Sequence, residues 1–327
     1  MAQRVVFHIG LMKSGTTFIQ GRLNANRARL ADQGILFPGP SWARHVRAVS
    51  DLMQAKNRKP GSWASLTEEI NDHPGTAIVS MEYLAPMGGP RIAALRRAFP
   101  DTEVRVAVTV RDLGRSVPAM WQEAIKNRRT WEWPEYVRSI ETGGDAGDRF
   151  WRQQHSARIV RRWASGVGAE NVHIVTVPPP GAPGETLWNR FGEVAGITPD
   201  SWDEAPRANE SLGAASTLVL RELNLATEDL PLAAYKKKVK ALGKHVMGKR
   251  RREEDPIGFV VPDWLRQESQ KIRNQLERSG APVVGDLDDL QPLDVAGIDP
   301  TQVDDRAQRD AAVAALAGAL RQVRRIS

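Results

Sequence analysis

Cysteine is absent from this chain of 327 residues. Disulfides, thiolate metal ligands and cysteine nucleophiles are therefore excluded, which fits a reducing compartment. Long apolar runs are also missing, because no stretch approaches the roughly 20 apolar residues that span a bilayer. The first residues enter an apolar strand pattern directly, without a basic segment and a signal core. We therefore expect a cytoplasmic protein.

Acidic residues are missing from one segment, residues 236–252, which holds nine lysines and arginines. The net charge of the chain is +7, so the remaining residues sum to 7 − 9 = −2. The basic character is therefore local, and this does not favour a protein that coats nucleic acid. Such a segment suits a flexible arm, a contact with an acidic substrate or an anionic lipid surface, or a solvated loop.

The most informative stretch is residues 4–20, RVVFHIGLMKSGTTFIQ. A β-branched apolar run enters a loop that holds Gly10, Lys13 and Gly15, and the loop is followed by a helix start. Thr16 and Thr17 leave this loop with their N–H groups and hydroxyls directed to one point. Because a helix N-terminus attracts negative charge, the pattern predicts an oxyanion at that point.

The position of the lysine separates this loop from a nucleoside triphosphatase loop. In G-x-x-x-x-G-K-[ST] the lysine follows the second glycine, reaches the β- and γ-phosphates, and precedes a hydroxyl that binds Mg²⁺. Here Thr16 follows Gly15, and the lysine stands inside the loop at Lys13. The loop therefore suits a shorter anion, bound without metal.

The run Lys13-Ser14-Gly15-Thr16-Thr17, followed by Phe18-Ile19-Gln20, resembles the 5′-phosphosulfate loop of PAPS-dependent sulfotransferases of the bacterial type. PAPS is 3′-phosphoadenosine 5′-phosphosulfate. The resemblance implies that Lys13, Ser14, Gly15, Thr16 and Thr17 bind this donor and that Lys13 is also catalytic. The family often has proline before the lysine, where this chain has Met12.

A second stretch resembles the 3′-phosphate site of the same family. The strand pattern 103–111 ends in Arg111, which the resemblance assigns to the 3′-phosphate. A planar guanidinium suits a terminal phosphate. The family usually adds a serine eight residues beyond this arginine, but Ala119 stands there and Ser116 lies five beyond. Ser116 is either a ligand or a plain helix N-terminal residue.

Two further residues, Glu82 and His45, are candidate site residues because of their positions in the sequence. Glu82 follows the strand pattern 76–80, and ligands of parallel sheets sit beyond the carboxyl ends of the strands. It is either the base that deprotonates the acceptor or a carboxylate at a helix start; the resemblance favours the base. His45, which follows the turn-rich loop 37–42, is either a substrate contact or a surface residue. Related bacterial sequences also show an Asn-x-Ser, here Asn209 to Ser211, before a helix ending in Arg-x-Leu-Asn, here 221–224.

The order of patterns predicts an α/β fold, a three-layer, P-loop-like parallel sheet of about four to five strands flanked by helices. We expect a single domain over residues 1–290, with the basic segment as an insert, and a C-terminal loop and helix over 291–327. Strands are expected near 5–9, 76–80, 103–111 and 171–177. Helices are expected near 16–33, 117–129, 150–163, 186–195, 212–226, 264–276 and 307–325.

Together these features predict a transferase that moves a sulfuryl group from PAPS to a hydroxyl or amine, leaving PAP, with no metal required. The acceptor is a small molecule or carbohydrate, open between a glycan, a glycolipid, a phenol and a secondary metabolite. No nucleic-acid partner is expected, and residues 236–252 are a candidate for peripheral contact with an anionic surface. Two alternatives remain: a P-loop small-molecule kinase or phosphotransferase, and a non-catalytic nucleotide- or nucleic-acid-binding protein.

Overall fold

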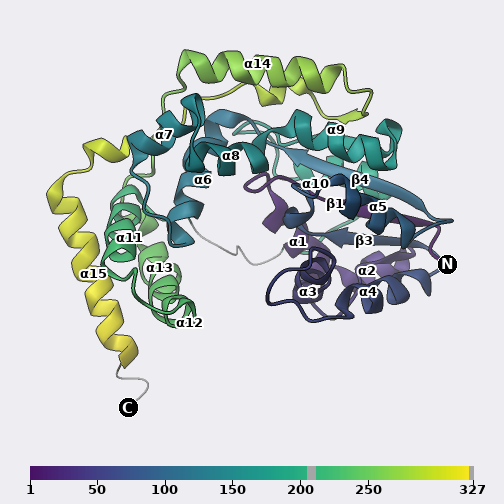
Figure 1. Cartoon of the computed structure of the whole chain (residues 1–327), viewed down its shortest axis with the longest axis horizontal. Coiled ribbons are helices and arrows are strands. Elements are labelled where there is room, and N and C mark those ends of the chain that lie inside the picture. The colour runs from purple at the N-terminus through teal and green to yellow at the C-terminus, as the bar shows by residue number, and fades with distance from the viewer. Residues whose placement is uncertain (205–210, 324–327) are drawn as a thin grey trace. The chain divides into compact units, whose positions relative to one another are not determined.

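The computed structural model describes residues 1–204 and 211–323 (Figure 1). The chain divides into two compact units. The described residues of the first unit are 1–112, 152–204 and 267–291, and those of the second are 113–151, 211–266 and 292–323. Residues after 290 thus fall mostly in the second unit, and one domain over 1–290 stays a prediction. Asn209 lies outside the described residues.

The first unit contains a six-stranded sheet in the order β2-β3-β1-β4-β5-β6, and every pairing in it is parallel. The prediction of a parallel α/β sheet is therefore confirmed. The count exceeds the expected four to five because two edge strands, β2 and β6, have two residues each and leave no periodic pattern. The strands are β1 (Arg4–His8), β2 (Ile35–Leu36), β3 (Thr76–Ser80), β4 (Glu103–Val110), β5 (Val172–Thr176) and β6 (Val283–Val284).

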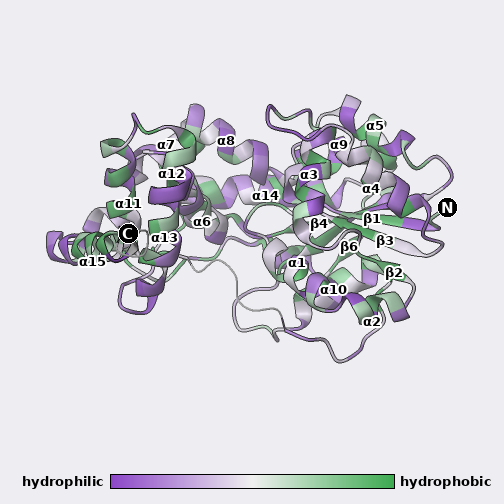
Figure 2. Ribbon diagram, turned by 90° about the horizontal axis from the view of Figure 1, so that it is seen from below, coloured by the Kyte–Doolittle hydropathy of each residue, from purple (hydrophilic) through white to green (hydrophobic). Residues whose placement is uncertain are grey.

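Helices cover both faces of this sheet, as Figure 2 shows with α5, α9, α3 and α4 on one side and α1, α10 and α2 on the other. The central strands are apolar along their length, because parallel strands covered on both faces are buried on both. The face toward α1 and α10 packs Val6, Ile78 and Ala107 against Leu23 and Phe191. Helices of this unit are α1 (Thr16–Ala25), α2 (Arg27–Asp32), α3 (Trp42–Leu52), α4 (Ser62–Asn71), α5 (Gly89–Arg97), α9 (Ser156–Val167) and α10 (Thr186–Ala195), with short turns η1 (Glu82–Leu84), η2 (Ala169–Asn171) and η5 (Leu287–Leu290).

The single helix expected over 16–33 is wrong: it is broken at Asn26 into α1 and α2. The Asn26 side chain donates to the carbonyl oxygens of Arg22 (2.8 Å) and Asp203 (3.0 Å), and it accepts from the Asp203 N–H (2.8 Å). Asparagine side chains compete with the helix for backbone groups in this way. The break anchors the end of α1 to a segment 177 residues later.

The second unit is helical. Its elements are α6 (Leu113–Lys126), α7 (Trp133–Thr142), α11 (Ala214–Ala226), α12 (Leu232–Tyr235), the π-helix η3 (Lys236–Lys240), α13 (Ala241–His245), the 3₁₀ turns η4 (Met247–Arg252) and η6 (Pro300–Gln302), and α15 (Asp305–Val323). Two helices, α8 (Asp145–Gln154) and α14 (Asp263–Glu277), contribute residues to both units. The helix expected at 150–163 is α8 and α9, separated at His155.

Among the described residues, no helix has the length and apolar character needed to cross a bilayer.

Candidate active site

The loop after β1 runs along β4 before it turns. The Ile9 N–H donates to the Ala107 carbonyl (2.9 Å) and the Leu11 N–H to the Thr109 carbonyl (3.0 Å), so the strand pairing continues past the end of β1. A tight turn follows, closed by the Ser14 N–H on the Leu11 carbonyl (3.2 Å). The turn therefore forms beside the carboxyl end of β4, directly before Arg111.

Three successive carbonyl groups of this turn accept hydrogen bonds from protein side chains. The Ser14 hydroxyl donates to the Leu11 carbonyl (2.6 Å), and the buried Gln154 amide donates to the Met12 carbonyl (2.8 Å). Arg111 Nη1 donates to the Lys13 carbonyl (3.2 Å). The negative ends of these three peptide groups are therefore engaged by donors of the protein.

The N–H groups at the start of α1 differ from these carbonyl groups in their hydrogen bonding. Gly15 is the N-cap in the left-handed conformation (φ 84°), and its carbonyl accepts from the N–H groups of Phe18 (3.0 Å) and Ile19 (3.2 Å). Within residues 1–204 and 211–323, the N–H groups of Gly15, Thr16 and Thr17 have no acceptor. Successive N–H groups at a helix start form an anion-binding concavity. The prediction of an oxyanion site thus has a matching backbone geometry.

A row of buried side chains that are linked by hydrogen bonds, which we call the polar chain, lies beneath the loop. His8 Nδ1 lies 2.7 Å from the Ser80 hydroxyl, and His8 Nε2 lies 3.3 Å from the Thr109 hydroxyl, which in turn lies 2.7 Å from the Ser14 hydroxyl. All four side chains are fully buried. Burial lowers the pKa of His8 to about 3, so the imidazole is neutral at physiological pH. The polar chain joins β3, β1 and β4 to the loop.

Gly10 is required by this packing. A Cβ atom at Gly10 would lie 2.0 Å from the Thr109 hydroxyl oxygen and 2.7 Å from His8 Nε2. The loop backbone therefore rests directly on the polar chain, and a larger residue would displace it.

Glu82 lies just beyond β3, the neighbour of β1, in the short turn η1. Its Oε2 accepts a hydrogen bond from Gln20 Nε2 (3.1 Å), and Gln20 is a buried residue of α1. The Met81 N–H donates to the His8 carbonyl (3.0 Å), which fixes the segment before Glu82 against β1. The candidate base is thus attached to the same helix that begins at the anion-binding loop.

His45 is buried, and both of its ring nitrogens bond to the protein. His45 Nδ1 accepts from the Ser80 N–H (3.2 Å), so Nε2 carries the proton that is donated to the Pro38 carbonyl (2.9 Å). Burial is the main cause that lowers the pKa of His45 to about 4. The residue fastens the loop before α3 to the end of β3, and its contact with substrate stays a prediction.

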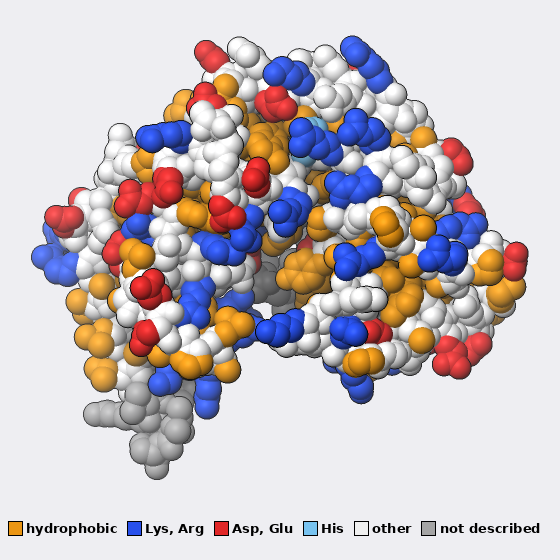
Figure 3. All heavy atoms as spheres, viewed as in Figure 1, with side chains coloured by type: hydrophobic (Ala, Val, Ile, Leu, Met, Phe, Trp, Pro, Cys, Tyr) orange, Lys and Arg blue, Asp and Glu red, His pale blue; other side chains and the backbone are white. Residues whose placement is uncertain are grey.

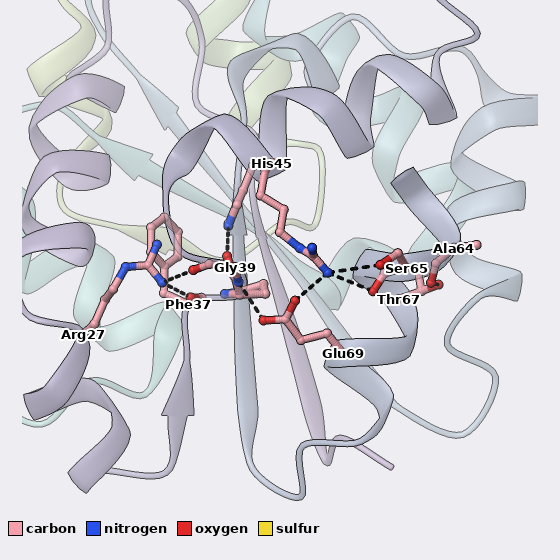
Figure 4. Close-up of polar contacts among 10 residues, drawn as sticks. Arg27, Phe37, Gly39, His45, Ala64, Ser65, Thr67 and Glu69 are labelled. Atoms are coloured by element: carbon pink, nitrogen blue, oxygen red, sulfur yellow. Dashed lines mark hydrogen bonds and ion pairs between the residues drawn. The ribbon is translucent and has the colours of Figure 1, made fainter. Parts of the chain in front are cut away.

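Charged side chains hold the same loop, as Figure 4 shows. Arg27 donates to the carbonyls of Phe37 and Gly39, while Glu69 accepts from the Gly39 N–H (2.6 Å) and pairs with Arg44 (2.8 Å). Next along the chain, the Trp42 indole N–H donates to the Ser80 carbonyl (3.2 Å). Trp42 is partly exposed and lies at the same strand end as Glu82.

The first unit therefore brings together most of the predicted residues: Lys13, Ser14, Gly15, Thr16, Thr17, Arg111 and Glu82. Ser116 and Ala119 lie in α6 of the second unit, where Ser116 is buried, and a role for Ser116 at the donor stays a prediction. Sequence reasoning missed His8 and Gln154. A histidine inside an apolar strand was a usable signal for His8, but Gln154 lies 142 residues from Met12 and carried none.

Within the described part of the chain, no group of three or more histidine, aspartate and glutamate side chains could hold a metal ion.

No protein-family model matches the chain, and no curated protein matches it. Among solved structures, the chain is similar to a sulfotransferase from Alicyclobacillus acidocaldarius. The two are 15% identical, and the match covers 71% of this chain and 98% of that chain with a TM-score of 0.42. A likeness of this extent does not specify a reaction or a substrate for this chain.

Proposed function

We propose that this chain is a sulfotransferase that moves a sulfuryl group from PAPS to a hydroxyl or amine of a small-molecule or carbohydrate acceptor. The observation that carries the proposal is the bond between Arg111 and the Lys13 carbonyl. This hydrogen bond joins two cationic residues, each of which follows a central strand. The loop that it stabilises also has three N–H groups that have no acceptor among the described residues. A nucleotide with anionic groups at its 5′ and 3′ positions requires two such sites.

The residues of the loop fit a phosphosulfate. The N–H groups of Gly15, Thr16 and Thr17 would donate to its oxygens, and the Lys13 ammonium would neutralise the charge that develops as the sulfuryl group leaves. Arg111 would pair with the 3′-phosphate through its planar guanidinium. PAPS itself supplies the activated sulfuryl group.

The Glu82 carboxylate, which lies beside Gln20, would accept the proton that the acceptor loses. Its hydrogen bond to Gln20 Nε2 (3.1 Å) limits the rotation of the carboxylate and keeps it at the end of β3. The acceptor would then lie on the side of the loop where β3 and β1 end, because parallel sheets bind ligands beyond their carboxyl edge.

The proposal is tested by calorimetric titration in EDTA with PAP, 5′-AMP and 3′-AMP. The two monophosphates each lack one anionic group of PAP, so they separate the two subsites. Lys13→Ala should weaken PAP and 5′-AMP alike, by about tenfold to a hundredfold for a charged hydrogen-bonding group. Arg111→Ala should weaken PAP more than 5′-AMP.

An exposed lysine of the same unit provides the control. Lys59→Ala removes the same charge from a loop outside the site and should leave PAP binding unchanged. Absence of PAP binding, together with Mg²⁺-dependent binding of ATP, would contradict the proposal and support phosphoryl transfer instead.

A further inference from the structure

The basic segment predicted from the sequence is an ordered part of the second unit. Residues 232–252 form α12, η3, α13 and η4 without interruption by a long loop. Four apolar side chains on one side of this segment are buried: Tyr235, Val239, Leu242 and Met247. The spacing of 235, 239 and 242 is that of one helical face, so the segment is amphipathic.

Contacts with the rest of the unit fix its orientation. The Tyr235 hydroxyl donates to the Asn224 side chain of α11 (2.8 Å), and the Arg128 guanidinium lies 4.9 Å from the centre of the Tyr235 ring. Glu254, just after the segment, accepts from Arg250 (2.9 Å) and from the Ser216 hydroxyl (2.7 Å). These contacts attach the segment to the rest of the second unit.

Of the nine cations in the segment, Arg250 alone is recorded in ion pairs among the described residues, with Glu253 and Glu254. The remaining eight are exposed. Lys240 donates to the neutral Asn127 side chain (2.7 Å), and none of the eight pairs with a carboxylate in residues 1–204 and 211–323. We define these eight as the basic surface: Lys236, Lys237, Lys238, Lys240, Lys244, Lys249, Arg251 and Arg252.

The second unit also carries exposed apolar side chains. Leu232 begins α12, four residues before Lys236, and is 54% exposed. On α15, which packs against α13 and η4, Val313, Leu316 and Leu320 form an exposed stripe at helical spacing. Figure 3 shows hydrophobic side chains over the lower half of α15 and around α12, with lysine and arginine side chains beside the latter.

We propose that the basic surface, together with Leu232 and the stripe on α15, binds the headgroup region of a membrane rich in anionic lipids. Lysine and arginine side chains are attracted to the negative surface potential of such membranes. Exposed leucine and valine side chains gain free energy when they leave water at the boundary between headgroups and acyl chains. The same apolar residues offer no stacking surface to nucleic-acid bases, which single-strand binders provide with aromatic rings.

This inference does not depend on the proposed reaction, since neither the loop nor Arg111 takes part. It is tested by sedimentation of the full chain with vesicles of phosphatidylcholine alone and with 30% phosphatidylserine, at about 0.1 M salt, where surface charges still attract over about 10 Å. Binding is expected only to the anionic vesicles. It should be lost at about 0.5 M salt.

A charge variant tests the basic surface. Lys236→Gln/Lys237→Gln/Lys238→Gln should weaken partitioning about a hundredfold, because each cation near the membrane contributes about fivefold. Lys56→Gln/Lys59→Gln/Arg91→Gln removes three exposed cations from the first unit and changes the net charge by the same amount. This matched variant should bind as the wild type does. Equal loss in the two variants would show a response to net charge and would overturn the proposal.

An apolar variant distinguishes a membrane from a soluble polyanion. Leu232→Ser/Leu316→Ser should weaken vesicle binding about tenfold, since each leucine buries only part of its side chain. Val260→Ser changes a residue that is 79% exposed but lies outside the surface, and it should have no effect. Tight binding to duplex DNA without vesicle binding, or identical vesicle binding by Leu232→Ser/Leu316→Ser and Val260→Ser, would overturn the proposal.

Discussion

Arg111 Nη1 donates a hydrogen bond to the carbonyl oxygen of Lys13 at 3.2 Å. The two residues are 98 apart in sequence, but each follows one of two adjacent strands, β1 and β4. Lys13 has a positive φ of 66°, which is uncommon for a residue other than glycine. Arg111 therefore stabilises the backbone conformation of the loop in addition to contributing its own charge.

The first prediction concerns the shape of the Arg111 side chain. Arg111→Lys keeps the positive charge but replaces the planar fork of donors by an ammonium. Affinity for PAP should fall about tenfold, the loss of one charge-assisted hydrogen bond, as measured by calorimetry. Arg105→Lys is the control, because Arg105 lies on the same strand and pairs with Glu103 (2.6 Å) away from the loop. Equal affinities in wild type and Arg111→Lys would contradict a geometric role.

The second prediction concerns Gly15. A Cβ atom there would lie 2.4 Å from Leu187 Cδ2, and the φ of 84° is unfavourable for any other residue. Gly34 has a similar φ of 71° but no atom within 4 Å of a Cβ. Gly34→Ala should therefore cost only the backbone term, about 1–2 kcal/mol in free energy of unfolding. Gly15→Ala should cost more and should also weaken PAP binding, whereas equal costs would mean that Leu187 yields without penalty.

The third prediction concerns the polar chain beneath the loop. Thr109→Val keeps the shape of the side chain but leaves the buried His8 Nε2 and the Ser14 hydroxyl without this partner. The free energy of unfolding should fall by about 1–3 kcal/mol, as measured by urea denaturation. PAP affinity should fall about fivefold as well, corresponding to about 1 kcal/mol.

Thr102→Val separates the two effects. Thr102 is also buried, and its hydroxyl donates to the Ala2 carbonyl (3.1 Å) before β4 begins. This substitution should lower stability without changing PAP affinity. If both variants left PAP affinity unchanged, the polar chain would stabilise the fold without positioning the loop.

The sheet and the shape of the loop after β1 could be predicted because their signals are local. The apolar run before Gly10, the lysine at 13 and the two threonines all lie within a few residues of one another, and the structure places them as strand, turn and helix start. The edge strands β2 and β6 could not be predicted, because two residues carry no periodicity. Side-chain competition at Asn26 likewise depends on Asp203, which no local pattern reveals.

The supporting contacts of the site were the main omission. Gln154 and Leu187 reach the loop from distant helices, and their roles follow only from the packing of those helices. His45 had a clear sequence position, but its burial against Pro38 and Ser80 depends on the fold of the loop before α3. The sequence around His45 is rich in arginine and therefore gives no sign that this histidine is buried.

The fourth prediction is a dependence of stability on pH. Burial lowers the pKa of His8 to about 3 and that of His45 to about 4, whereas both titrate near 6.5 in an unfolded chain. Between these values the unfolded chain binds protons that the folded chain does not, so stability falls as the pH falls below 6.5. At pH 5 each histidine should cost about 2 kcal/mol relative to pH 8. Urea denaturation at a series of pH values measures the sum.

His8→Asn provides the test of this assignment, because its amide can still bond to Ser80 or Thr109 but does not titrate. The dependence of stability on pH should become less steep between pH 6.5 and 5 but should not vanish, because burial also lowers the pKa of His45 and His155 to about 4 and lowers the pKa of His173. Thr102→Val should lower stability by the same amount at every pH and keep the wild-type slope. An unchanged slope in His8→Asn would show that other groups cause the pH dependence.

The last prediction concerns Glu82 and Gln20. Once an acceptor is found, Glu82→Gln should lower kcat by about 10²–10⁴, the usual contribution of a positioned base, and should leave PAP affinity within about twofold. The amide retains a bond to Gln20, so the local structure is conserved. Gln20→Ala should lower kcat less, since the carboxylate remains but loses its partner at 3.1 Å. Full activity in Glu82→Gln would instead assign Glu82 to the start of η1 as a carboxylate that stabilises the turn.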